Sequence, residues 1–496
     1  MDTFQKEILN PFLKSTDIFK NGNAFCINGR YYTYSEFSET ISKIRTALQR
    51  ENIQGKNIGL IAHDDIETYA SIFAIWLEGA AFVPIHPQQP IQNCLEIFDQ
   101  TDVSLVLNSD TNRIFPSIKT IDCKKLEFEK ADLFTKSVSD DSLAIVFYTS
   151  GTTGKPKGVA ITRANLAAFV KAFWNIGYAI DCNDRSLQIY NLSFDGSVMA
   201  YLFPLIKGAC VYTITPNHLR YTFIAELLTT YSLTVAFMVP SMIRYLKPYF
   251  GEINLPSLRY NFVGGEAVPL DLIQEWSQCI ANATIDIIYG PTENTVFCSY
   301  YRYNRQGINK AFNGTLSIGR STTSGLMIIV DNKNNEIIHN QQGELCLYGS
   351  QLTPGYINNP ELNKEVFFID KQGRRFYKTG DICFKDSEGD IMFCGRTDSQ
   401  VKVQGFRVEL GDIEFHSHEC LPGQKTVALA FEDKIGNIEI ALCIEGELKD
   451  KQNLLRQLKL KLPQYMMPSK IISHPKFPLN SNGKIDRNEL RKLIPE

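Results

Sequence analysis

The segment 148–158, Tyr-Thr-Ser-Gly-Thr-Thr-Gly-Lys-Pro-Lys-Gly, carries residue types that can hold a polyphosphate. Its glycines leave backbone amides free to approach an anion closely, and its hydroxyl and lysine side chains supply donors and positive charge. The spacing differs from G-x-x-x-x-G-K-[ST], so the segment is not a Walker-type P-loop. Because Gly, Ser and Thr clusters are also common in surface loops, phosphate binding is a hypothesis that needs support from the rest of the chain.

A second candidate segment, Tyr-Gly-Pro-Thr-Glu at 289–293, follows an apolar run. Its aromatic ring, tight turn, hydroxyl and carboxylate together suit adenine stacking and the binding of Mg²⁺-ATP. Two further segments combine glycine with charge, Thr-Gly-Asp at 379–381 and Gly-Arg-Thr-Asp at 395–398. A carboxylate such as Asp381 can accept hydrogen bonds from both hydroxyls of a ribose, although Thr-Gly-Asp by itself is also a common turn.

The loop 148–158 resembles the phosphate-binding signature of the AMP-forming, acyl-adenylate-forming superfamily. This superfamily includes acyl-CoA synthetases, firefly-type luciferases and the adenylation domains of nonribosomal peptide synthesis. About nine fixed positions match, and at residue frequencies of roughly 5–10% each coincidence is negligible. The other motifs follow in the family's order, and the resemblance covers about residues 30–490. It implies an AMP-forming ligase that uses ATP and Mg²⁺.

For the nucleotide, the resemblance implies that Tyr289 stacks on adenine and that Asp381 and Arg396 bind the ribose. Thr292 is implied to contact the α-phosphate and Glu293 to hold Mg²⁺. Lys484, near the C-terminus, is implied to bridge the substrate carboxylate and the charge that develops at the α-phosphate, which a long mobile cation suits. Thr292, Glu293 and Lys484 are therefore the expected catalytic residues. The expected ATP contacts are Thr149, Ser150, Gly151, Thr152, Thr153, Gly154, Lys157, Gly264, Gly265, Glu266, Tyr289, Asp381 and Arg396.

The segment 191–199, Asn-Leu-Ser-Phe-Asp-Gly-Ser-Val-Met, distinguishes subfamilies. Domains that activate α-amino acids have a Phe-Asp-x-Ser pattern whose aspartate pairs with the substrate ammonium, and Asp195 occupies that position. Acyl- and aryl-CoA ligases and luciferases generally lack this aspartate. A helix cap is the structural alternative for Asp195. Aligned by motif, the expected substrate pocket comprises Asp195, Gly196, Met199, Phe237, Phe262, Gly264, Ile288, Val296 and Phe297, together with Lys484.

The side chain of the acid is predicted from the apolar character of this pocket. Beyond Asp195 and Lys484 the pocket has no ionisable residue, so a buried charged substrate side chain would cost several kcal/mol. Three phenylalanines favour a small or branched aliphatic amino acid. Apolar pockets separate one methylene by about 1–3 kcal/mol, so the amino acid and its enantiomer stay open.

Three alternatives to this function remain. A D-alanine–carrier-protein ligase shares the chemistry, and a CoA ligase of a small carboxylic acid shares the fold but leaves Asp195 unexplained. A non-catalytic binding protein derived from the fold would predict losses at Lys484, Glu293 or Asp381, which are all present.

The spacing of apolar runs predicts the elements that position these residues. Short β-branched runs, such as 57–62 and 284–290, alternate with helix-like stretches and predict a largely parallel α/β sheet. After about residue 320, turn signals at 331–336 and 340–344 predict an antiparallel β subdomain. A polar break near 395–405 precedes about a hundred residues of mixed character.

The expected fold is therefore α/β, with two domains. The large N-terminal domain, residues 1–397, comprises α/β subdomains and a small β subdomain. The C-terminal domain, residues 398–496, is expected to be a small mobile α+β domain. The family resemblance makes Asp398 the hinge between them.

The composition excludes several classes of protein. The chain has 496 residues, enough for two to four domains or subdomains. Its 51 Lys and Arg residues against 54 Asp and Glu residues give a formal net charge of −3, which offers no overall attraction to nucleic acid or to an anionic membrane. The twelve cysteines include no C-x-x-C pair, and no apolar run is long enough to span a membrane. These features predict a cytoplasmic protein with neither nucleic-acid nor membrane partners.

The expected partners follow from the resemblance. No carrier-protein signature follows residue 487 and no condensation domain precedes residue 1. The sequence therefore predicts a free-standing adenylation enzyme. Its acceptor would be the phosphopantetheine arm of a peptidyl or acyl carrier protein, loaded in trans.

Overall fold

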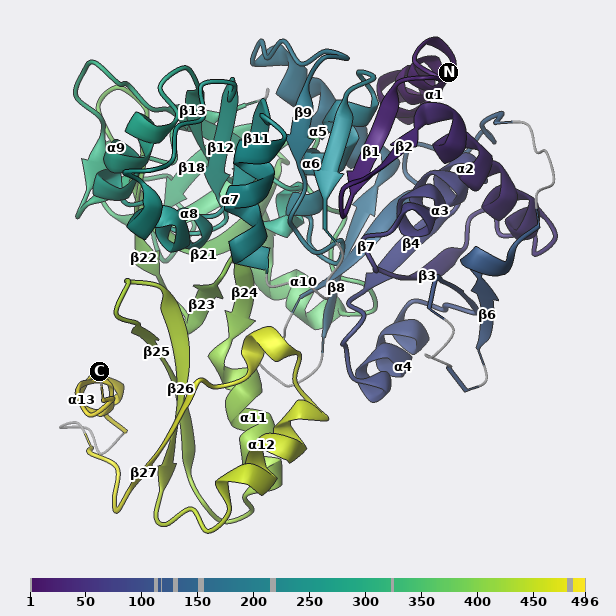
Figure 1. Ribbon diagram of the computed structural model, residues 1–496. Helices are drawn as coiled ribbons and strands as arrows, with labels where there is room; N and C mark the ends of the chain where they lie inside the picture. The colour runs from purple at the N-terminus through teal and green to yellow at the C-terminus, as the bar shows by residue number, and fades with distance from the viewer. Residues whose placement is uncertain are drawn as a thin grey trace. The chain divides into compact units, whose positions relative to one another are not determined.

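The computed structural model describes residues 2–110, 115–116, 118–127, 133–149, 156–214, 220–322, 325–479 and 485–495. The chain divides into two units (Figure 1). The first comprises Met1–Pro87, Phe98–Phe147 and Gly158–Thr397, and the second comprises Gln88–Ile97, Tyr148–Lys157 and Asp398–Glu496.

The larger sheet of the first unit has nine strands in the order β17-β14-β13-β12-β11-β9-β10-β1-β2. The central strands, from β13 to β1 in this order, pair in parallel, and β2, β14 and β17 pair antiparallel at the two edges. The strands are β1 (Asn23–Ile27), β2 (Arg30–Thr33), β9 (Arg185–Leu187), β10 (Cys210–Thr213), β11 (Val235–Met238), β12 (Tyr260–Gly264), β13 (Thr284–Tyr289), β14 (Ser299–Arg302) and β17 (Arg320–Ser321).

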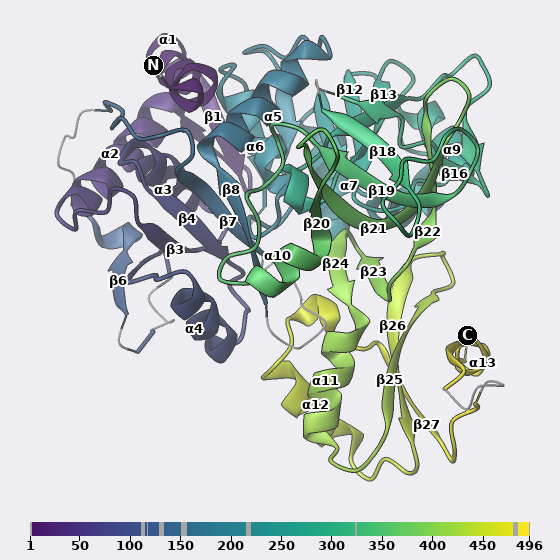
Figure 2. The same ribbon diagram turned by 180° about the vertical axis from the view of Figure 1, so that it is seen from behind.

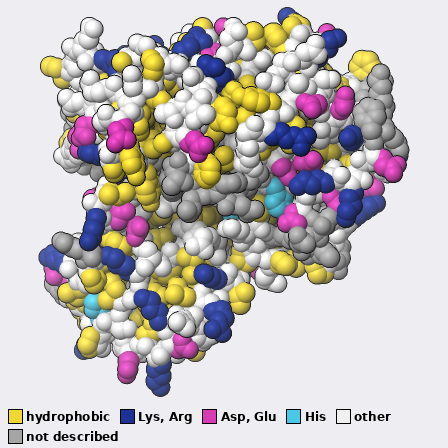
Figure 3. Space-filling model, viewed as in Figure 1, with side chains coloured by type: hydrophobic (Ala, Val, Ile, Leu, Met, Phe, Trp, Pro, Cys, Tyr) yellow, Lys and Arg dark blue, Asp and Glu magenta, His cyan; other side chains and the backbone are white. Residues whose placement is uncertain are grey.

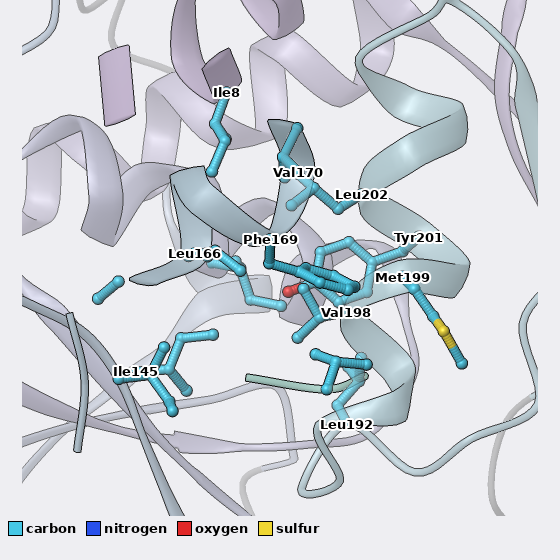
Figure 4. Close-up of a cluster of buried hydrophobic side chains, with 14 of the residues drawn as sticks. Ile8, Ile145, Leu166, Phe169, Val170, Leu192, Val198, Met199, Tyr201 and Leu202 are labelled. Carbon is cyan, nitrogen blue, oxygen red and sulfur yellow. The ribbon is translucent and has the colours of Figure 1, made fainter. Parts of the chain in front are cut away.

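The central strands bury both faces and so contribute to two apolar cores. In β11, Val235 and Phe237 belong to one core and Ala236 and Met238 to the other, as the two-residue period of a strand requires. Helices α5 and α6 contribute to the first core, where Figure 4 shows Phe169 of α5 among side chains of α6. Helices α8 and α9 contribute to the second core. The helices of this region are α5 (Arg163–Asn175), α6 (Gly196–Leu205), α7 (Arg220–Thr230), α8 (Pro240–Leu246), η3 (Lys247–Tyr249) and α9 (Leu270–Cys279).

A second sheet has six strands in the order β6-β5-β3-β4-β7-β8. The first five strands in this order pair in parallel. Helix α3 contacts β3 and β4, and α2 lies beside α3 in both views (Figure 1, Figure 2). The strands are β3 (Asn57–Ile61), β4 (Ala81–Ile85), β5 (Leu105–Asn108), β6 (Lys119–Asp122), β7 (Leu143–Thr149) and β8 (Lys157–Thr162). The helices are η1 (Gln5–Leu9), α1 (Asn10–Ile18), α2 (Tyr34–Gln49), α3 (Ile66–Leu77), α4 (Ile91–Gln100) and η2 (Cys123–Lys125).

An antiparallel sheet follows these two, with strands in the order β18-β19-β21-β20 and β22 paired to β21. At the turn after β18, the Asp331 carboxylate accepts from the backbone amides of Lys333 and Asn335 at 2.8 and 2.9 Å, the usual reason for Asp in a turn. The predicted α/β fold with a small β subdomain is confirmed. The elements are β15 (Ala311–Phe312), β16 (Thr315–Leu316), β18 (Leu326–Val330), β19 (Gly343–Tyr348), α10 (Pro360–Val366), β20 (Phe367–Ile369), β21 (Arg375–Lys385) and β22 (Ile391–Arg396).

The second unit contains a hairpin and a three-stranded sheet, β25-β26-β27, covered by helices on both faces. Along β26, Leu442 packs in a core with residues of α11 and α12, whereas Cys443 packs on the opposite face with Leu490 of α13. Figure 2 shows α11 and α12 together on one side of this sheet and α13 on the other. The elements are β23 (Gln400–Val403), β24 (Phe406–Glu409), α11 (Leu410–Cys420), β25 (Thr426–Glu432), β26 (Ile438–Glu445), α12 (Lys451–Lys459), η5 (Gln464–Met466), β27 (Lys470–His474) and α13 (Arg487–Lys492).

Charges of both signs are dispersed over the face in Figure 3. Within the described residues, no helix combines the length and apolar character needed to cross a membrane.

One buried carboxylate links helices α2 and α3, which accompany the second sheet. Glu78, directly after α3, has a fully buried side chain that lies 2.6 Å from Nε of Arg45 on α2 and 2.5 Å from Nζ of Lys136. Burial alone would raise the pKa of Glu78, but hydrogen bonds from Lys136, Arg45 and Gln49 lower it below its ordinary value. The charged carboxylate therefore stabilises the fold.

We expect Glu78→Ala to lower the free energy of unfolding by about 3–5 kcal/mol, because it leaves the buried Arg45 guanidinium without its partner. The difference from the parent should be largest near neutral pH. It should shrink as the pH falls below about 4, where the carboxylate becomes protonated in the unfolded and then in the folded chain. Urea unfolding at several pH values measures this. Glu39→Ala, at an exposed position of α2, is the matched control, and an equal loss in both variants would contradict the prediction.

Candidate active site

Four loops of the first unit begin at the carboxyl ends of parallel strands β9, β11, β12 and β13. The chain passes from β9 to β10 on one side and then returns to β11 on the other, so a topological switch point lies between β9 and β11. Ligands of open α/β sheets bind at the carboxyl edge beside such a point. Asp195 follows β9, Ser241 follows β11, Gly264 ends β12 and Tyr289 ends β13.

Tyr289, Asp381 and Arg396 form one hydrogen-bonded group. The Tyr289 hydroxyl donates to Oδ2 of Asp381 at 2.5 Å, and Arg396 donates from Nη1 to Oδ1 of the same carboxylate. Asp381 and Arg396 face each other across β21 and β22, and Asp381 is 7% exposed. Burial and then the Asp381 charge raise the pKa of Tyr289, so its hydroxyl stays a donor. The three residues assigned to adenosine thus lie together.

Glu293 lies in a short helix, η4 (Thr292–Asn294), and its side chain is fully buried. The Tyr356 hydroxyl donates to its Oε1 at 2.5 Å, and the Thr353 amide donates to its backbone carbonyl at 2.9 Å. Thr292, beside it, is half-buried. A carboxylate is a ligand that Mg²⁺ accepts together with phosphate oxygens. Within the described residues, no three His, Cys, Asp or Glu side chains gather at one metal site.

The backbone after η4 is strained. Val296 has φ 71°, which a β-branched residue rarely adopts and which costs about 1–3 kcal/mol. Gln351 holds the turn, since its Nε2 donates to the Phe297 carbonyl at 2.9 Å. A Cβ at Gly290 would lie 2.4 Å from Cα of Phe297, so the Tyr-Gly-Pro-Thr-Glu segment needs glycine there. This packing brings Val296 and Phe297 beside the loop that carries Glu293.

Asp195 is half-buried and immediately precedes α6. Its side chain makes no capping hydrogen bond to that helix, so the structure gives no support to the helix-cap alternative. The ring of Tyr190 lies 3.6 Å from where a Cβ of Gly196 would stand. On α6, Met199 directs its sulfur away from Ile145 and Leu166 (Figure 4).

Four of the expected pocket residues share one face of the nine-stranded sheet. Phe237 pairs in register with Phe262, and Gly264 pairs with Ile288. Phe237 and Phe262 stack with ring centroids 4.6 Å apart. Met199, Phe237, Phe262, Ile288, Val296 and Phe297 all belong to the same apolar core. The structure therefore brings these expected pocket residues together.

The Gly264-Gly265-Glu266 segment is positioned by two close contacts. A Cβ at Gly264 would lie 2.2 Å from the Ile288 carbonyl oxygen, so β12 and β13 approach as closely as they do because this residue is glycine. Glu266 accepts from the backbone amide and the hydroxyl of Ser241 at 2.9 and 2.8 Å. It thereby joins the loop after β12 to the start of α8.

Several expected residues lie elsewhere. Thr149 ends β7, Lys157 begins β8 and Asp398 begins the last segment of the second compact unit. Lys157, which belongs to that same unit, places its Nζ 3.4 Å from the buried carboxylate of Glu409. The Asp398 carboxylate accepts from the Gln400 amide at 3.1 Å. Ser150, Gly151, Thr152, Thr153, Gly154 and Lys484 lie outside the described residues.

The sequence did not predict three residues that contact expected site residues. Tyr356 donates a hydrogen bond to Glu293, and Ser241 donates one to Glu266. Glu409 forms an ion pair with Lys157. Tyr356 lies within 343–367, a stretch that resembles the family. Its partner, however, is 63 residues away in the chain, and spacing alone cannot reveal such a pair. Ser241 and Glu409 lie outside the recognised binding motifs or at their ends.

Comparison with known proteins places this site in a family. The profile described as AMP-binding enzyme matches residues 16–357. This match identifies the chain as an adenylate-forming ligase. The chain belongs to the AMP-binding enzyme family and is similar to its adenylation domains of nonribosomal peptide synthesis.

Two curated relatives illustrate this similarity. Zwittermicin A synthase ZmaJ of Bacillus cereus is 31% identical over 93% of this chain and 90% of its own length. Surfactin synthase subunit 2 of Bacillus subtilis is 30% identical over 94% of this chain, but the chain spans 13% of that protein. Among solved structures, the Vibrio cholerae adenylation domain AlmE, in complex with glycyl-adenosine-5'-phosphate, has a TM-score of 0.87 at 23% identity, covering 98% of this chain and 97% of AlmE. The chain is therefore an ATP-using enzyme that activates an amino acid or another carboxylic acid.

We expect Tyr356→Phe to weaken the binding of Mg²⁺-ATP about 5- to 150-fold, because the buried Glu293 carboxylate loses its hydroxyl donor. Calorimetric titration with Mg²⁺-ATP measures this without any acid substrate. Tyr348→Phe, at a half-buried position of β19, is the matched control. Parent-like affinity in Tyr356→Phe would mean that the hydrogen bond to Glu293 has no part in nucleotide binding.

Proposed function

We propose that the protein activates a small or branched aliphatic amino acid as its aminoacyl adenylate and transfers it to the phosphopantetheine thiol of a carrier protein. The observation that carries this proposal is Asp195, a half-buried carboxylate that does not cap its helix. A carboxylate at this position can pair with a substrate ammonium, which a fatty acid does not have.

The side-chain preference is supported by the burial of the three expected pocket phenylalanines. Phe237, Phe262 and Phe297 are each at most 2% exposed, so the floor of the proposed pocket is apolar and closed. A charged substrate side chain there would lose its hydration without gaining a partner. This favours alanine, valine, leucine or isoleucine over charged or large aromatic amino acids.

For the first step, we propose that a carboxylate oxygen of the amino acid attacks the α-phosphorus of ATP. The bond from the α-phosphorus to the bridging oxygen breaks, and pyrophosphate leaves with that oxygen. Asp381 and Arg396 hold the ribose, and Tyr289 stacks on adenine. Thr149, Lys157, Thr292 and Lys484 stabilise the phosphates, together with the residues of 150–154. Glu293 holds Mg²⁺, which when bound neutralises negative charge on the phosphate oxygens.

Both carboxylate oxygens of Asp381 accept hydrogen bonds in this structure, one from Tyr289 and one from Arg396. Ribose hydroxyls can bind it by replacing or sharing the donors from Tyr289 and Arg396. That exchange couples ribose binding to the position of the Tyr289 ring, which we propose stacks on adenine. The binding of ribose and the binding of adenine would thus be coupled through Tyr289, Asp381 and Arg396.

For the second step, we propose that residues 398–496 rotate about Asp398 before the phosphopantetheine thiol attacks the aminoacyl carbonyl. The thioester forms, and AMP leaves. The division of the chain between Thr397 and Asp398 supports this proposal, as does the exposed position of Asp398.

Pyrophosphate release with a panel of L- and D-amino acids, fatty acids and aryl acids tests the function. We expect one small or branched aliphatic amino acid to dominate. In Asp195→Asn, its KM should rise about 100-fold or more, since the ammonium loses its charged partner, with the KM for ATP unchanged. Glu226→Gln, at an exposed position of α7, is the control for loss of a carboxylate elsewhere. Signal limited to acids without an amine would refute amino-acid activation, and a D-alanine signal would identify the D-alanine–carrier ligase.

Asp398→Pro separates the two steps. Proline fixes φ near −65° and removes a backbone donor, so we expect amino-acid-dependent pyrophosphate release within about 3-fold of the parent and at least about 10-fold less thioester on a carrier protein. Asp398→Ala, which keeps backbone freedom, should behave like the parent. Thioester assays with a phosphopantetheinylated carrier measure this, and a normal yield in the proline variant would refute the hinge.

A further inference from the structure

A row of side chains crosses four neighbouring strands on the face of the sheet that holds the proposed pocket. Phe237 of β11, Phe262 of β12, Asp286 of β13 and Arg302 of β14 are partners in successive register. Residues in register on neighbouring strands point to the same face. The row therefore starts with two pocket phenylalanines and ends in an ion pair at the edge of the parallel strands.

Asp286 is a carboxylate inside the apolar core, with 1% of its side chain exposed. Arg302 donates to both of its oxygens, from Nε and Nη2 at 2.9 Å each, and the Tyr178 hydroxyl donates to Oδ2 at 2.6 Å. A buried carboxylate is costly unless such donors compensate it. Hydrogen bonding to Asp286 raises the pKa of Arg302, and burial followed by the Asp286 charge raises that of Tyr178. Tyr178 and Arg302 therefore both keep their protons near neutral pH.

Tyr178 connects this polar network to the pocket phenylalanines. Its ring meets Phe262 edge-on, with centroids 4.9 Å apart and planes at 86°. Phe262 in turn stacks on Phe237 at 4.6 Å and 14°. Tyr178 also lies 4.7 Å from Phe173 of α5, measured between ring centroids. Since the hydroxyl fixes one end of the tyrosine, its ring cannot move without breaking the bond to Asp286.

We propose that Tyr178, Asp286 and Arg302 are positioning residues that hold Phe262 and Phe237 in place and thereby set the length of substrate side chain that the enzyme accepts. This inference rests on the proposed function, in which Phe262 and Phe237 line the substrate pocket. An apolar pocket rejects one extra methylene only if its wall does not yield. The ion pair between the buried Asp286 and the half-exposed Arg302 makes the wall stiff at a distance from the substrate.

The test compares Tyr178→Phe with the parent on a series of aliphatic amino acids that grow by one methylene. Pyrophosphate release gives kcat/KM for each. In apolar pockets the ratio between the best substrate and its next larger homologue is about 10- to 200-fold, and we expect Tyr178→Phe to reduce this ratio about 5-fold or more. The value of kcat for the best substrate should stay within about 3-fold of the parent. Parent-like ratios in an active Tyr178→Phe would overturn the proposal and leave the network a purely structural role.

A second variant and two controls make the outcome specific. Arg302→Lys, at a half-exposed side chain, keeps the positive charge but loses the bidentate contact with Asp286. It should therefore also reduce the ratio of kcat/KM between the best substrate and its next larger homologue. Phe262→Leu, which widens the floor directly, should give the largest shift. Tyr301→Phe removes a hydroxyl that the Lys310 amide contacts at 2.9 Å, on a side chain packed against the second core, and should leave the ratio unchanged.

Failure of the proposed function would look different. It would leave the parent without any amino-acid-dependent pyrophosphate release. In that case the same variants can be assayed with a homologous series of carboxylic acids, because Phe237 and Phe262 belong to other elements than Asp195. A parent that discriminates chain length in that series, beside a Tyr178→Phe variant that discriminates equally well, would overturn the inference alone.

Discussion

The parallel pairing of β9, β11, β12 and β13 is the constraint on which the site in the first unit depends. It brings four strand ends to one edge, so loops that are far apart in sequence lie next to each other. The spacing at this edge is set by backbone contact, since at Gly264 a Cβ would stand 2.2 Å from the Ile288 carbonyl. Glycines at 264 and 290 are therefore needed to bring the strands and loops close enough to form the site.

Tyrosine hydroxyls recur as donors to carboxylates around this edge: Tyr289 to Asp381, Tyr356 to Glu293 and Tyr178 to Asp286. A neutral donor stabilises a carboxylate without cancelling its charge. Glu293, which accepts from Tyr356, is the residue that we propose holds Mg²⁺. At Asp286, where Arg302 adds two further bonds, the charge is compensated inside the protein and serves to fix neighbouring rings.

The fold and the choice of acid are determined by different parts of the molecule. Members of the AMP-binding family share the adenylate-forming fold. They act on different acids, so the fold alone does not identify the substrate. We propose that few groups determine that choice: the Asp195 carboxylate, the phenylalanines of β11 and β12, and Val296 in the strained turn. The positions of these groups depend on the residues that pack against them. Residues that do not touch the substrate are therefore also expected to affect which acid is accepted.

The sequence by itself determined the family, the alternating α/β pattern, the nucleotide motifs and Asp195 as the amine-binding candidate. These are local signals, because glycine spacing, apolar runs and short motifs are read within about fifteen residues. Only the tertiary structure decided which donors hold the carboxylates. Tyr178 meets Asp286 and Tyr356 meets Glu293 across 108 and 63 residues, through strand order and register that no local pattern specifies. The polar groups that hold the site in place are therefore a product of the fold, because a buried charge finds its partner in space and not along the chain.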